Sequence, residues 1–192
     1  MRFGESILLL LVAGSLVGQP PAPGRGPAPP PPGGSEGVRR KLAEVRSTGS
    51  VTEKLLSLSR DYLERSERKE NRNEFAVNRY LAAADALVHA AEHQQHIANK
   101  TGPPPPDKGE LARHLERVYF RLRQADYFVK QSADPNATTI AGFARQYYQE
   151  ALRAYERPDP RIADECAKSA EDLMRALENL AQATVRVPAP PK

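Results

Sequence analysis

Three of the four histidines in this 192-residue chain lie within a stretch of eight residues. His89 and His93 are four residues apart and His96 follows after three more, so an α-helix would present the imidazoles on one side. Imidazole nitrogens are common ligands of zinc and other transition metals, and the carboxylates of Asp85 and Glu92 could join them or orient the rings. The spacing is therefore compatible with a metal site.

The same residues also fit a helix face that simply meets solvent. They lie opposite an apolar stripe and alternate with glutamines, as the polar side of an amphipathic helix does. Metal sites usually take ligands from more than one element, and His114 is the only further histidine. We therefore assign no metal, cofactor-binding or catalytic residue from the sequence. A metal-binding exported protein that uses His89, His93 and His96 is kept as the alternative.

Other reactive residues form no recognisable catalytic pattern. Cys166 is the only cysteine and falls on an apolar seam, so we expect a buried small side chain and not a nucleophile. The sequence contains no glycine-rich phosphate loop, no HExxH and no nucleophile elbow. The Asn-x-Thr sequons at Asn99 and Asn136 would matter only in a eukaryotic secretory cell. We expect a protein that is not an enzyme and holds no cofactor.

The histidines belong to the most regular helical pattern of the chain, residues 75–98. Apolar side chains recur there with a period of three to four residues, as on a helix that faces a core. The positions of this stripe are Tyr80, Leu81, Ala84, Leu87, Val88, Ala91 and Ala98. We expect this helix to be the centre on which the others pack.

Five further segments show the same periodicity and predict helices that start near residues 38, 50, 107, 140 and 159. The run from Leu111 to Val129 keeps a strict four-three spacing, which predicts one continuous helix. Asp107 and Asp159 precede two of the segments and are natural N-caps. Residues 64–74 are almost entirely charged or polar and fit either a surface helix or a loop. The sequence thus predicts an all-α bundle of about five to six helices, some with long coiled-coil-like seams, and no β-sheet.

The two ends of the chain differ in composition from this helical part. Residues 7–17 form an apolar run of 11 residues behind Arg2, too short to span a bilayer and typical of a secretory signal peptide. We assign residues 1–18 to this signal, with an uncleaved interfacial tail as the alternative. Residues 19–37 are rich in proline and glycine and are expected to be a disordered linker, as is the shorter tail 187–192. A single bundle domain is expected over 38–186.

Charge and composition narrow the function. The formal net charge is +4, but acidic residues are interspersed among the basic ones throughout, whereas nucleic-acid binders gather basic residues on one face. We expect no nucleic-acid partner and no stable membrane insertion after signal cleavage, and leave a small-molecule partner open. Long apolar seams and a tethering linker favour contact with a protein partner or with a second copy. The sequence therefore predicts a secreted or periplasmic protein with a binding or structural role.

Overall fold

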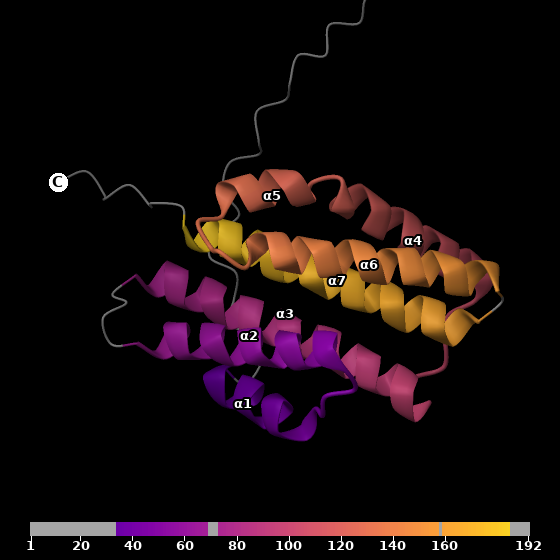
Figure 1. Ribbon diagram of the computed structural model, residues 1–192, viewed down its shortest axis with the longest axis horizontal. Helices are drawn as coiled ribbons and strands as arrows, with labels where there is room; N and C mark the ends of the chain where they lie inside the picture. Colours follow the sequence, from indigo (N-terminus) through magenta and orange to yellow (C-terminus); the bar gives the residue numbers. More distant parts are fainter. Residues whose placement is uncertain (1–33, 69–72, 158, 185–192) are drawn as a thin grey trace, which may run out of the picture.

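The computed structural model describes residues 34–68, 73–157 and 159–184, and the regular secondary structure within them is all α-helix (Figure 1). The helices are α1 (Gly34–Glu44), α2 (Ser50–Glu67), α3 (Glu74–Asn99), α4 (Lys108–Leu122), α5 (Ala125–Gln131), α6 (Ala137–Glu156) and α7 (Pro160–Ala183). The described residues contain no β-strand, which confirms the predicted all-α bundle. None of these helices is both long enough and apolar enough to cross a membrane.

Two element boundaries differ from the sequence-based expectation. Helix α1 begins at Gly34, so residues 34–37, which were assigned to the linker, form a helical turn ahead of the fully buried Val38. The helix expected to run from Leu111 to Val129 breaks at Arg123 and Gln124, and the described residues therefore form seven helices. The break lets both halves of the apolar seam pack on α6 and α7.

Other expected segments are only partly described. Helix α2 continues to Glu67, and α3 begins at Glu74 after Asn73, whose side chain accepts a hydrogen bond from the backbone N–H of Ala76 at 3.3 Å. Residues 64–67 and Glu74 are thus helical, whereas the centre of this segment, residues 69–72, lies outside the described residues. The predicted signal peptide (1–18), the linker up to residue 33 and the tail 187–192 also lie outside them, and these assignments stay predictions.

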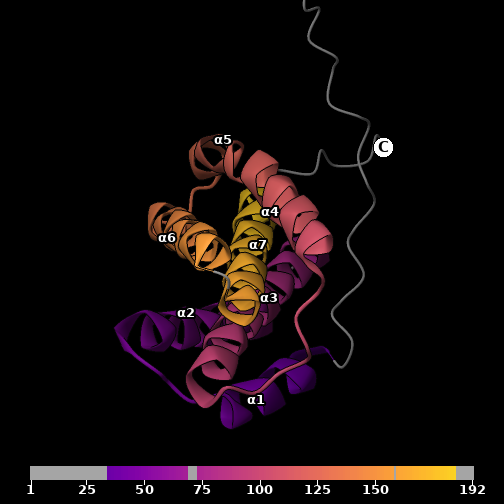
Figure 2. The same ribbon diagram turned by 90° about the vertical axis from the view of Figure 1, so that its right-hand side faces the viewer.

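Helices α3 and α7 form the centre of the bundle (Figure 2). They run antiparallel, since Arg79 donates to Asn179 at one end and the Ser169 hydroxyl donates to the carbonyl of Ala90 nearer the other. Helix α2 packs on α3, helix α6 packs on α7, and α4 with α5 covers the remaining side of α7. Helix α7 is therefore enclosed by neighbours on most of its surface.

The core consists of two apolar clusters along these helices. The larger one includes Leu58, Leu87, Leu173 and Leu177, all fully buried. The smaller one joins the start of α4 to α6 and α7 and contains Cys166, whose predicted burial is confirmed. Because α7 contributes to both clusters, even polar side chains at the edge of its seam are withdrawn from solvent.

Capping residues fix the ends of α3, α4 and α7. Asp107 and Asp159 accept hydrogen bonds from Glu110 N–H at 2.8 Å and Ile162 N–H at 3.2 Å, which confirms both predicted N-caps. Helix α3 ends in a left-handed turn at Lys100, with φ of 54°. The chain then passes through Gly102, whose φ of 97° is a conformation that favours glycine.

Candidate functional site

Helix α7 carries two adjacent pairs of acidic residues, Asp164 with Glu165 and Glu171 with Asp172. The pairs are seven residues apart, about two helical turns, so they lie on the same side of the helix. Three of the four are buried, and Glu165 is only 1% exposed. A buried carboxylate is costly unless a positive charge or hydrogen-bond donors compensate it. Each pair must therefore have partners on the neighbouring helices.

The ring of His93, on α3, lies between Glu165 and Asp172. Its Nδ1 is 2.8 Å from Oε2 of Glu165, and its Nε2 is 3.4 Å from Oδ2 of Asp172. Burial alone would lower the pKa of His93, but the hydrogen bonds to Asp172 and Glu165 outweigh it and raise the pKa to about 9. The two carboxylates thus hold this imidazole from both sides.

His96 reaches the same carboxylate oxygen from one helical turn further on. Its Nδ1 lies 3.1 Å from Oε2 of Glu165. Burial favours the neutral form of Glu165, yet the hydrogen bonds from His93 and His96 lower its pKa to about 2. Gly102 packs against the His96 ring, because a Cβ at that position would lie 3.2 Å from it. The turn after α3 therefore helps to orient the imidazole.

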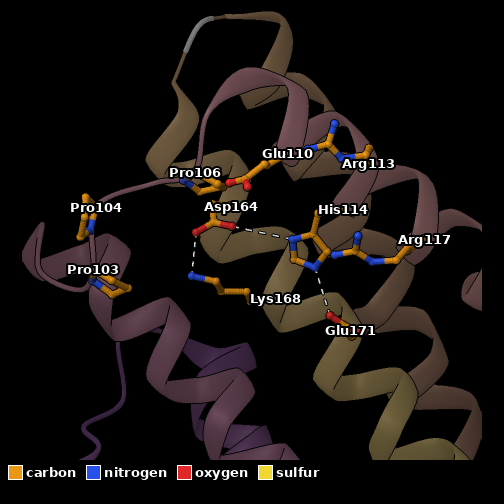
Figure 3. Close-up of a pocket in the computed structure, with 10 residues that line it drawn as sticks. All are labelled: Pro103, Pro104, Pro106, Glu110, Arg113, His114, Arg117, Asp164, Lys168 and Glu171. Carbon is orange, nitrogen blue, oxygen red and sulfur yellow. Dashed lines mark hydrogen bonds and ion pairs between the residues drawn. The ribbon is translucent and has the colours of Figure 1, made fainter.

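The remaining carboxylate of each pair, Asp164 and Glu171, holds His114 of α4 in the same manner (Figure 3). Its Nε2 is 3.1 Å from Oε2 of Glu171, and its Nδ1 is 3.7 Å from Oδ1 of Asp164. These two carboxylates raise the pKa of His114 to about 9 against the opposing effect of burial. Each acidic pair thus contributes one carboxylate to a histidine on α3 and one to a histidine on α4.

Lys168 lies between the carboxylates that hold His93 and His96 and those that hold His114. Its Nζ is 2.7 Å from Oδ2 of Asp164 and 3.4 Å from Oε1 of Glu165. The ammonium therefore occupies one oxygen of Glu165, while the other oxygen faces His93 and His96.

The structure separates the three histidines that the sequence placed in one row. His89 turns toward α1, where its Nε2 is 2.6 Å from Nζ of Lys41, and its Nδ1 is 3.2 Å from Oε2 of Glu92. His93 and His96 turn instead toward α7. The expectation that the row simply meets solvent is wrong for His93, whose side chain is 17% exposed.

Sequence reasoning missed Glu165 and Asp172 as partners of these histidines. The signal was present as two acidic pairs with a heptad spacing at the edge of the α7 seam. His114, which the sequence offered as a further ligand, engages Asp164 and Glu171.

No protein-family model matches this chain, and no curated protein and no solved structure is significantly similar to it. The function is therefore inferred from the geometry of the site. The ligand atoms of His93, His96 and Glu165 all lie within 4.8 Å of one another. Ligands at about 2.0 to 2.1 Å from a tetrahedral zinc ion are about 3.3 Å apart, so small shifts of these side chains would suffice to surround an ion.

Proposed function

We propose that the protein binds a divalent transition metal ion through Nδ1 of His93, Nδ1 of His96 and a carboxylate oxygen of Glu165. The observation that supports this proposal most directly is that Nδ1 of His93 and Nδ1 of His96 lie 2.8 Å and 3.1 Å from Oε2 of Glu165, which comes from a second helix. One ligand atom of each residue lies within 4.8 Å of those of the other two. From the sequence we assign no ligand on a second helix beside α3, and α7 supplies this ligand as Glu165. His89 is not part of this set, since it engages Lys41 and Glu92.

The surroundings of the three ligands suit a metal ion. Glu165 is buried and needs a positive charge nearby, which an imidazolium supplies in the absence of metal and a divalent ion would supply more strongly. Asp172 lies at the far nitrogen of His93, where a carboxylate can accept the Nε2–H hydrogen bond and fix the ring with Nδ1 toward the metal. Metal binding then replaces the proton on His93 and weakens as the pH falls.

The ligand types indicate which metals to expect. Two imidazoles and one carboxylate suit zinc and its neighbours in the first transition series, whereas calcium and magnesium prefer oxygen ligands. Three protein ligands leave a fourth tetrahedral position for water or another ligand. We propose a binding role for this site, in an exported protein as the N-terminal sequence predicts.

Zinc titration of metal-free protein tests the proposal. We expect one zinc ion per chain in calorimetry, and a stabilisation of about 2.7 kcal/mol at a hundred times the dissociation constant, measured by thermal unfolding. His96→Gln should abolish most of this stabilisation, because it removes a ligand whose side chain is partly exposed and dispensable for the core. Asp172→Asn should weaken binding by about 10 to 100 fold, as loss of a carboxylate that orients a ligand does.

His89→Gln is the matched control. It removes a neighbouring imidazole from the same helix, outside the proposed ligand set, and should leave zinc affinity unchanged. If zinc fails to stabilise the protein, or if His96→Gln keeps the effect while His89→Gln loses it, the proposed site is wrong.

Association with a protein partner or a second copy is a second candidate function. The long seams on which the sequence-based expectation rests are buried inside the bundle, as Leu115 and Leu177 illustrate, and no longer support it. The observation that favours it is a set of exposed aromatic side chains on α4 and α5, where Tyr119, Phe120 and Tyr127 are 45%, 56% and 60% exposed. Sedimentation equilibrium of the wild type and of Phe120→Ser would show whether this surface causes self-association.

A further inference from the structure

A pocket of about 590 Å³ lies beside the candidate metal site, between the loop that joins α3 to α4 and the facing sides of α4 and α7 (Figure 3). Pro103, Pro104 and Pro106 form its loop side. The volume falls within the range of about 300 to 1,000 Å³ that is usual for small-molecule sites. Proline rings provide a rigid, apolar wall.

The two buried or partly buried carboxylates at the base of this pocket already have cationic partners. Asp164 is 2.7 Å from Nζ of Lys168, and Glu171 is 3.1 Å from Nε2 of His114. In Figure 3 dashed lines join Asp164 to Lys168 and Glu171 to His114. They contribute little net charge toward a ligand.

The two arginines of the pocket, unlike these carboxylates, have no ion-pair partner among the described residues. Arg113 and Arg117 are one helical turn apart on α4, and both are exposed at the pocket. Within the part of the chain that the structure describes, neither guanidinium has a carboxylate within 4.0 Å. Glu110 is the one lining carboxylate that is likewise without an ion pair among the described residues. Two guanidinium charges against one carboxylate leave the pocket with an excess positive charge.

We propose that this pocket binds a small organic anion, a carboxylate carried on an apolar body. Guanidinium groups recognise carboxylates through pairs of charge-assisted hydrogen bonds, and residues one turn apart on a helix can approach the same group. The three prolines line the same pocket as the two arginines and supply apolar surface for such a body. This site shares neither ligands nor mechanism with the candidate metal site.

Binding of benzoate to protein freed of metal on a chelating resin tests this inference. We expect saturable changes in the NMR signals of the Arg113 and Arg117 side chains as benzoate is added. Acetate carries the same carboxylate without the ring and should bind several-fold more weakly, because it cannot contact the prolines. Arg117→Gln should weaken benzoate binding about tenfold, as the loss of a hydrogen bond to a charged group does.

Arg153→Gln provides the matched control, since Arg153 is an exposed arginine on α6 away from this pocket. It should leave benzoate binding unchanged. The inference is overturned if benzoate causes no saturable change, or if Arg153→Gln weakens binding as much as Arg117→Gln does. Equal affinity for acetate and benzoate would overturn the role of the proline wall. Because the protein is free of metal throughout, none of these outcomes depends on the zinc proposal.

Discussion

Replacing His114 by glutamine should flatten the dependence of the protein's stability on pH. The residue is 8% exposed and lies between Asp164 and Glu171, whose carboxylates raise its pKa from 6.5 to about 9. Since the folded-state pKa lies above the unfolded value, the native state binds this proton more tightly than the unfolded chain does. The stabilisation is complete below pH 6.5 and is lost as the pH rises through 9.

The size of the effect follows from the same pKa values. A change from 6.5 to about 9 is between two and three factors of ten in proton affinity, or about 3 kcal/mol. Solvent screening reduces this figure little, because the side chain is almost fully buried. His93 also has a pKa of about 9 and contributes over the same range. The free energy of unfolding of the wild type should therefore fall by up to about 6 kcal/mol between pH 6 and pH 10, and that of His114→Gln by roughly half as much.

Urea unfolding followed by circular dichroism at several pH values between 6 and 10, in metal-free buffer, measures both slopes. The variant should be less stable than the wild type at pH 6 and similar to it at pH 10. His89→Gln is the control, because it removes an imidazole that takes no part in the contacts of His114 with Asp164 and Glu171. Equal slopes for the wild type and His114→Gln would refute the reasoning.

Two further predictions concern the bundle itself. Leu177→Ala should cost about 2 to 5 kcal/mol in urea unfolding, because Leu177 is fully buried in the larger core cluster, whereas the exposed Lys54→Ala should cost less than about 0.5 kcal/mol. A smaller loss for Leu177→Ala would mean that the core collapses around the cavity or is looser than described. A chain that begins at Gly34 should unfold at the same temperature as the full chain, whereas one that lacks α1 should unfold at a lower temperature, since Val38 is fully buried. A lower melting temperature for the first truncation would indicate that residues 1–33 pack on the bundle.

Much of the fold could be predicted from periodicity and capping residues. The apolar seam of α7 is buried from Cys166 to Leu180 as its spacing predicts, and Asp159 caps that helix. The break at Arg123 and Gln124 could not be predicted, because the apolar spacing continues across it without interruption. Local pattern identifies which side of a helix is apolar, but the tertiary contacts of α6 and α7 decide whether the helix stays continuous.

The site was less accessible to sequence reasoning than the fold. The spacing of His93 and His96 placed both imidazoles on one side of α3, as the structure confirms. It could not show that this side faces α7. The position of a residue on its own helix fixes the direction of its side chain, but it does not identify the helix that packs there. Glu165 then becomes a partner only because α7 is enclosed and its polar edge is buried. Acidic residues at the edge of a predicted core seam, spaced by seven, are the sequence feature that would have indicated these contacts.

Because the chain's only thiol is buried, its chemical modification reports unfolding of the bundle. Cys166 lies in the smaller apolar cluster, where burial raises its pKa to about 12. The thiolate that reacts with alkylating agents and oxidants is then almost absent in the native state. Reagents reach the sulfur only in molecules whose α7 has separated from α4 and α6, so the labelling rate counts these openings. In an oxidising compartment, covalent dimers joined through Cys166 would accumulate only from molecules that had opened, and their abundance would measure how often the bundle comes apart there.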